Sequence, residues 1–232
     1  PVPGALLYQS GGSRHLGRVD HQDAFLDTDH LERERGITIF SKQAVLPLGE
    51  LEVTLLDTPG HVDFSAEMER TLQVLDYAIL VVSGADGVQG HTRTLWELLH
   101  RYQIPTFLFI NKMDQPGTDA AALTGELQQL LGEGCVPFAG LAPEEFQEAV
   151  ALRDEGAMEE YLEKGEVSPA RLRELIRRRR LFPCYFGSAL RLEGVDALLE
   201  GLRQYTLLPA YPAAFGAKVY KIAPDPQGVR LT

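Results

Sequence analysis

The stretch that decides the fold is Asp57-Thr58-Pro59-Gly60-His61, which directly follows the apolar run Leu51 to Leu56. The apolar run predicts a strand, and the Pro-Gly pair predicts a turn at its end. A strand that ends in this way carries the Asp57 carboxylate toward a bound metal and a bare backbone N–H toward a phosphate. The alternative is an ordinary strand exit, because proline and glycine are common in turns.

A second motif, Asn111-Lys112-Met113-Asp114, ends another apolar run, Thr106 to Ile110. Both motifs lie at the C-terminal ends of predicted strands, where open α/β sheets bind their ligands. The Asp114 carboxylate can accept two hydrogen bonds from the N1–H and 2-amino groups of guanine, a pair of donors that adenine lacks. Asn111 would brace the loop, and the aliphatic stem of Lys112 would cover the ring face.

A third loop follows the predicted strand Cys184 to Gly187. Its residues Ser188-Ala189-Leu190 offer backbone N–H groups that could meet the carbonyl oxygen of guanine. The triplet alone carries little information, but it lies where a third base-contacting loop is expected.

The charged segment Glu32 to Ile39 lies upstream of these motifs. Its order of charges, then glycine, then Thr38 suits a loop whose hydroxyl coordinates Mg²⁺ and whose backbone touches a γ-phosphate. The alternative is a solvated charged turn that enters the strand Phe40 to Leu46.

These motifs together resemble the translational GTPases, most closely elongation factor G and the tetracycline-resistance ribosomal protection proteins. The resemblance rests on Asp27 to Ile39, Asp57 to Phe64 and Asn111 to Asp114, and it runs from about Leu6 to the C-terminus. It implies GTP or GDP with Mg²⁺, a cytoplasmic protein, and hydrolysis that the ribosome stimulates through the full-length protein. In this family His follows Asp-Thr-Pro-Gly, whereas Ras-type switches carry Gln at that position. The resemblance therefore also implies that His61 orders the attacking water.

The same resemblance assigns roles residue by residue. Thr38 and Asp57 would be the metal ligands. The nucleotide-binding residues would be Asp57, Thr58, Pro59, Gly60, His61, Asn111, Lys112, Asp114, Ser188, Ala189 and Leu190. The short segment between Asp114 and Ser188 favours the ribosomal protection branch over elongation factor G, which usually carries a large insertion there.

One departure from the family pattern concerns the N-terminal side. The family opens with a strand and a Gly-x-x-x-x-Gly-Lys-Ser/Thr loop, and neither precedes Gly4 in this sequence. The helix that follows that loop is predicted at Ala5 to Ser10. Two function classes therefore remain: a translational GTPase, or a non-catalytic module with the same fold that cannot hold phosphates. The missing strand would lie between the strand ending at Asp57 and the strand Tyr77 to Ser83.

Strand and helix signals alternate along the chain, which predicts an α/β fold of the P-loop GTPase type with helices on both faces of a mainly parallel sheet. We expect this domain over residues 1–210, a helical insertion at about 135–180, and the beginning of a β-barrel domain at 211–232, with a strand from Ala213 to Ile222. The other predicted helices are Ser65 to Leu75, Thr92 to Tyr102, Asp119 to Leu131, Pro143 to Leu152, Ser168 to Arg180 and Val195 to Tyr205.

Composition agrees with a globular protein: the 232 residues are 44% hydrophobic and 24% charged. The net charge of −11 argues against broad binding to DNA or another phosphate backbone, and we expect a monomer. The two cysteines offer no disulfide framework, and no membrane segment is expected. Cys184 is predicted to be a small core residue. Arg177 to Arg180 could touch ribosomal RNA, but cations are also favoured at a helix C-terminus.

Overall fold

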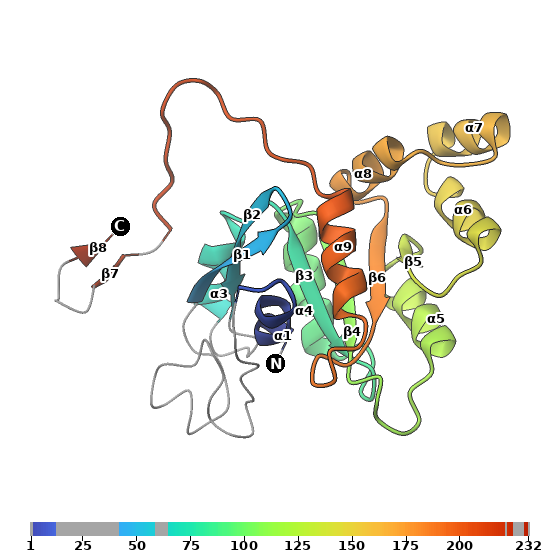
Figure 1. Cartoon of the computed structure of the whole chain (residues 1–232), viewed down its shortest axis with the longest axis horizontal. Coiled ribbons are helices and arrows are strands. Elements are labelled where there is room, and N and C mark those ends of the chain that lie inside the picture. Colours follow the sequence, from blue (N-terminus) through green and yellow to red (C-terminus); the bar gives the residue numbers. More distant parts are fainter. Residues whose placement is uncertain (1, 13–41, 59–64, 221, 225–229, 232) are drawn as a thin grey trace.

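The computed structural model describes residues 2–12, 42–58, 65–220, 222–224 and 230–231. At its centre lies a four-stranded parallel sheet with helices on both faces (Figure 1). The strands, in their spatial order, are β3 (Ala78–Ser83), β4 (Thr106–Asn111), β6 (Phe182–Phe186) and β5 (Cys135–Pro137). This arrangement confirms the predicted α/β class.

Strand β4 shows why both faces of the sheet are covered. All of its residues are buried, and successive side chains of a strand point to opposite faces. Phe107 and Phe109 join one apolar core, whereas Leu108 and Ile110 join the other. A strand that is apolar on both sides needs helices on both sides.

The helices divide between these two cores. Helices α3 (Ser65–Leu72), α4 (Gly90–Arg101) and α5 (Ala120–Leu131) contribute to the core of Leu108. Helices α1 (Val2–Gln9) and α9 (Val195–Tyr205) contact each other and contribute to the core of Phe107. The predicted bounds of α9 are the observed ones, because its apolar residues recur at helical spacing.

Strands β1 (Lys42–Leu48) and β2 (Leu51–Asp57) form an antiparallel hairpin. The strand predicted from Phe40 to Leu46 is thus observed to run further, because pairing continues to a two-residue turn. Gly49 has φ of 66°, as the first position of a type II′ turn requires. Among the described strands β2 is not paired with β3, so the position expected for a further strand between them is not closed by direct pairing.

A helical segment lies between β5 and β6 (Figure 1). It consists of α6 (Pro143–Ala151), α7 (Glu155–Lys164) and α8 (Pro169–Arg177). The sequence pattern did not predict α7, because Ala157 alone of its residues is fully buried and the apolar period is weak. Its ends do carry signals: Asp154 caps the N-terminus through the Ala157 N–H, and Gly165 closes the C-terminus with φ of 78°.

The C-terminal tail differs from the prediction. Residues 207–220 and 222 form no strand, so the strand predicted from Ala213 to Ile222 is wrong over this part. Most of its described apolar side chains are exposed, Phe215 at 97%, so burial of one face does not stabilise an extended chain here. A short antiparallel pair follows, between β7 (Ala223–Pro224) and β8 (Arg230–Leu231). Of the helices in the described ranges, none has the length and apolar character that crossing a membrane requires.

Candidate functional site: the loops after β4 and β6

Two of the predicted motifs meet at the C-terminal edge of the sheet. Asn111 is the last residue of β4, and Ser188 follows the end of the neighbouring strand β6. The Asn111 Oδ1 atom accepts a hydrogen bond of 2.9 Å from the Ala189 backbone N–H, and both residues are buried. A side-chain brace between two loops in the core holds them in one relative position.

The loop after Asn111 turns sharply away from the strand. Lys112 adopts the left-handed conformation with φ of 65°, which is uncommon for a residue with a side chain. The Met113 N–H donates to the Gly187 carbonyl at 3.0 Å, and the Thr118 hydroxyl donates to the Met113 carbonyl at 2.8 Å. These bonds fix the backbone on both sides of Asp114.

The loop after β6 is closed on itself. Ser188 and Glu193 exchange two backbone hydrogen bonds of 3.0 Å each. Two glycines make this closure possible, because a Cβ at Gly187 would lie 2.0 Å from the Glu193 carbonyl oxygen and one at Gly194 would lie 2.3 Å from the Phe186 carbonyl oxygen. The loop therefore presents Ala189 and Leu190 on a rigid frame.

Asp114 has a partner that the sequence did not predict. The Arg191 Nε atom lies 3.4 Å from Asp114 Oδ2, and the exposed fractions of the two side chains are 58% and 17%. Sequence reasoning stopped at Leu190, although Arg191 is the next residue of the same loop. The carboxylate proposed for base recognition is thus paired with a cation in the structure.

Several polar atoms buried at this edge of the sheet have no hydrogen-bond partner among the residues that the structure describes. They are the hydroxyl oxygens of Ser83, at the end of β3, and Ser188, and both ring nitrogens of His91, at the start of α4. Buried polar groups are nearly always satisfied in native proteins, so each one needs an explanation. A ligand that binds beside these two loops could supply the missing hydrogen-bond partners.

The remaining predicted residues are only partly described. Asp57 ends β2 and Thr58 follows it, and both side chains are half-buried. Thr38, Pro59, Gly60 and His61 lie outside the described residues. The metal-binding and catalytic roles of this group therefore stay predictions.

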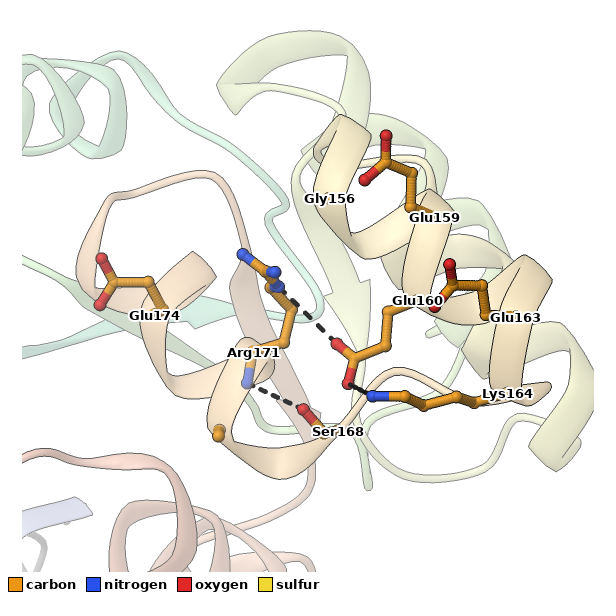
Figure 2. Close-up of a pocket in the computed structure, with 9 residues that line it drawn as sticks. Gly156, Glu159, Glu160, Glu163, Lys164, Ser168, Arg171 and Glu174 are labelled. Carbon is orange, nitrogen blue, oxygen red and sulfur yellow. Dashed lines mark hydrogen bonds and ion pairs between the residues drawn. The ribbon is translucent and has the colours of Figure 1, made fainter.

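A hollow of about 420 Å³ lies away from these loops, between α7 and α8 (Figure 2). Glu160 points from α7 toward the start of α8, where its carboxylate pairs with Lys164 at 3.3 Å and with Arg171 at 3.7 Å. A hydrogen bond from Ser168 lowers the pKa of Glu160, and Ser168 also caps α8 through the Arg171 N–H.

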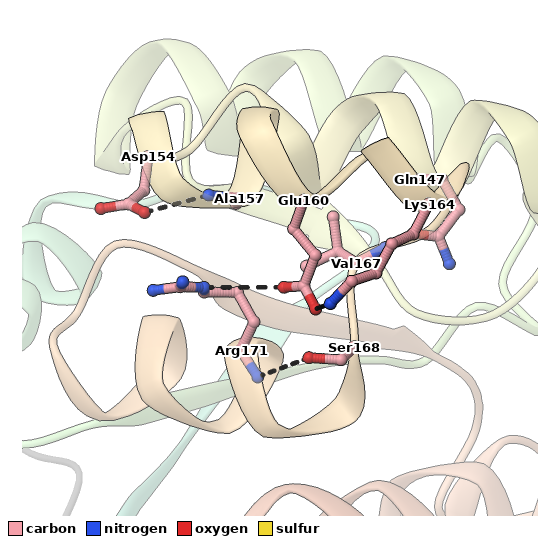
Figure 3. A network of polar contacts seen from close by, with 8 residues as sticks. All are labelled: Gln147, Asp154, Ala157, Glu160, Lys164, Val167, Ser168 and Arg171. Atoms are coloured by element: carbon pink, nitrogen blue, oxygen red, sulfur yellow. Dashed lines mark hydrogen bonds and ion pairs between the residues drawn. The ribbon is translucent and has the colours of Figure 1, made fainter. Parts of the chain in front are cut away.

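These contacts satisfy one another within a single network (Figure 3). Gln147 of α6 extends it by accepting a 2.7 Å bond from the Val167 N–H. Because Glu160, Lys164 and Arg171 pair with one another, and Gln147 binds Val167, these contacts serve to hold the three helices together. The candidate site is therefore at the sheet edge.

Comparison with known proteins identifies the family of the domain. The profile of the elongation factor Tu GTP binding domain matches residues 2–207. The oxytetracycline resistance protein of Streptomyces rimosus is 36% identical over 246 residues, which cover 94% of this chain and 37% of that protein. The tetracycline resistance protein TetO of Campylobacter jejuni is 35% identical over 235 residues, with the same two coverages.

Elongation factor G of Gluconobacter oxydans (strain 621H) is 32% identical over 263 residues, which cover 92% of this chain and 37% of that protein. The chain thus spans 37% of the length of these relatives. A crystal structure of a Thermus thermophilus protein matches with a TM-score of 0.79 at 28% identity, covering 89% of this chain and 38% of that chain.

Proposed function

The chain belongs to the translational GTPases, by its match to the elongation factor Tu GTP binding domain, and from this premise we propose that its loops after β4 and β6 bind the guanine base of GTP or GDP. The observation that carries the proposal is the 2.9 Å bond between Asn111 Oδ1 and the Ala189 N–H. It ties the loop of Asp114 to the loop of Ser188, which supports a single site that uses the Asp114 carboxylate and the Leu190 N–H.

Each loop has a distinct part in the proposed recognition. Asp114 accepts the N1–H and 2-amino groups of guanine. The Ser188 and Ala189 N–H groups already donate to Glu193 and Asn111, so the Leu190 N–H is the donor of this loop that would meet the guanine carbonyl oxygen. Lys112, which is exposed, lays its aliphatic stem along the ring face. Adenine would leave the Asp114 carboxylate without its two donors, and an unpaired buried acceptor is costly.

We assign the phosphate side of the site to residues that precede β1 in the sequence and to those at and after the end of β2. Asp57 and Thr38 offer a carboxylate and a hydroxyl, the hard oxygen ligands that Mg²⁺ prefers. Mg²⁺ held by these ligands would supply positive charge that offsets the charge of the phosphates. Thr58, Pro59 and Gly60 would bring a backbone N–H to the γ-phosphate, and His61 would order the attacking water.

For the longer protein we propose GTP hydrolysis coupled to the ribosome. This rests on the relatives: the chain matches an elongation factor G and proteins named for tetracycline resistance over most of its own length. The tetracycline resistance proteins stand at 35% to 36% identity and the elongation factor at 32%. This order favours a role in ribosomal protection from tetracycline over one in translocation.

Calorimetric titration of the chain with GDP, ADP and XDP tests the base site. We expect GDP to bind more tightly than ADP, and Asp114→Asn to shift the preference toward XDP, whose 2-oxo group suits an amide donor. Asp86→Asn makes the same change at an exposed carboxylate after β3 and serves as the matched control. Equal affinity for GDP and ADP would sink the proposal.

A further inference from the structure

Arg191 forms an ion pair with Asp114, the carboxylate to which the proposed function assigns guanine recognition. Arg191 Nε and Asp114 Oδ2 are 3.4 Å apart. Asp114 is the acceptor that the proposed function gives to guanine, and a bound base would need the same carboxylate. Arg191 and a bound guanine base would therefore compete for the Asp114 carboxylate.

The backbone of Arg191 is held in place while its side chain is not. The Arg191 N–H donates to the Ser188 carbonyl at 3.1 Å, inside the loop that Ser188 and Glu193 close. The side chain beyond this anchor is 58% exposed and has no other ion pair among the described residues. A long, exposed side chain on a fixed backbone can leave its partner without any rearrangement of the loop.

Asp114 has a reason to hold a cation when no base is present. Its side chain is only 17% exposed, and a carboxylate that has lost most of its water is stabilised by a nearby positive charge. A guanine base would replace that cation with two N–H donors in the same region. The two partners satisfy the same need, so they compete.

We propose that Arg191 is a placeholder that occupies the Asp114 carboxylate in the empty site and is displaced when guanine binds. The inference rests on the proposed function and adds regulation to it. Breaking the pair lowers the affinity for guanine by the strength of one partly exposed ion pair, which is about two- to fivefold. Because such pairs are screened by ions, the penalty falls as salt rises.

The test uses guanosine, an uncharged ligand whose own binding is little affected by screening. Its affinity for the chain is measured by NMR titration at ionic strengths from about 0.01 M to about 1 M, over which the Debye length falls from about 30 Å to about 3 Å. Four proteins are compared: wild type, Arg191→Gln, Arg191→Lys and Arg178→Gln. The last removes an exposed arginine whose ion pair, with Glu174, lies on α8 and away from the site.

In the wild type and in Arg178→Gln we expect guanosine to bind more tightly as salt rises. Arg191→Gln should bind about two- to fivefold more tightly than wild type at low salt and show no salt dependence. Arg191→Lys should keep the salt dependence because it keeps the charge. Adenosine should bind all four proteins alike, since it does not engage Asp114.

Two results overturn the placeholder alone: Arg191→Gln binds guanosine as wild type does at every salt concentration, or it binds more weakly. The weaker binding would mean that Arg191 supports the bound base. If the folded wild type and all variants fail to prefer guanosine to adenosine, the proposed base site fails, and the placeholder fails with it.

Discussion

The side-chain oxygen of Asn111 accepts a 2.9 Å hydrogen bond from the backbone N–H of Ala189, which lies 78 residues further along the chain. The bond joins the ends of two neighbouring parallel strands. It holds the two loops at this edge of the sheet in one relative position. Loss of the Asn111 side-chain oxygen should therefore lower both the free energy of unfolding and the affinity for the base.

Replacing Asn111 by alanine tests that unit. The change leaves the buried Ala189 N–H without an acceptor, and we expect the free energy of unfolding to fall by about 1–3 kcal/mol. Urea denaturation measures the loss. Gln115→Ala, at an exposed position of the adjoining loop, should stay within about 0.5 kcal/mol of wild type. Equal stability of the Asn111 variant and wild type would show that the bond does not hold the loops.

Arg179 offers a second test, at the opposite edge of the sheet. Its guanidinium donates to the Ile104 carbonyl and, at 3.0 Å, to the Thr106 hydroxyl, and it lies 5.1 Å and 5.0 Å from the ring centres of Trp96 and Phe182. Burial lowers the pKa of Arg179 to about 10, so the side chain is still a cation at neutral pH. These contacts support the structural role for Arg179 over one in RNA binding.

We expect Arg179→Ala to lower the free energy of unfolding by about 2–4 kcal/mol, because it removes two hydrogen-bond donors and leaves a cavity beside the Trp96 and Phe182 rings. Arg179→Met, which keeps much of the volume, should cost less. Trp96 is the sole tryptophan of the sequence, so its fluorescence follows unfolding at this site. A fully stable alanine variant would contradict the assignment.

The contribution of Glu160 to stability should depend on pH. The hydrogen bond from Ser168, followed by the contact with Lys164, lowers its pKa from the ordinary value of 4.5. A carboxyl group with a lowered pKa in the folded state binds protons less tightly there than in the unfolded chain. Its stabilising contribution is therefore complete above pH 4.5 and is lost as the pH falls through the folded-state value.

Thermal unfolding of Glu160→Gln should show a lower midpoint than wild type at neutral pH, and the difference should shrink in acid. Glu163→Gln, an exposed neighbour on the same helix, is the matched control and should show no such pH dependence. A difference that stays constant from neutral pH into acid would mean that the charge of Glu160 does not act through this network.

His61→Ala addresses catalysis in a protein that carries the whole nucleotide pocket. If His61 orders the attacking water, ribosome-stimulated hydrolysis should fall by orders of magnitude while the affinity for GTP changes little. Single-turnover hydrolysis and equilibrium binding measure the two quantities separately. Normal stimulated turnover in the variant would remove the proposed role.

Local patterns were sufficient for several elements. The strand Leu51 to Asp57 and the helix Val195 to Tyr205 were predicted with the bounds that the structure shows, because their apolar spacing and flanking turn residues are strong. Helix α7 and the short strand β5 were not predicted. The first has a weak apolar period, and the second is a strand of three residues whose identity depends on pairing with β6.

The C-terminal tail shows the opposite failure, in which a local pattern predicts a strand that the structure does not form. Residues 213–222 alternate as a strand does, yet the described part of this range forms none. Alternation favours an extended chain only where a neighbouring strand supplies hydrogen bonds and one face is buried. Neither condition can be read from the alternation itself.

By itself the amino-acid sequence determined the class of fold, the ends of the strands that carry the site, and the residue types that suit a guanine base. These follow from short-range spacing and from the chemistry of single side chains. The tertiary structure alone decided that Asn111 binds Ala189 and that Arg191 pairs with Asp114. It alone decided that buried polar atoms of Ser83, His91 and Ser188 have no partner within the described part of the chain. Parallel pairing of β4 with β6 brings residues far apart in sequence to one edge, and contacts made there depend on packing that no local pattern contains.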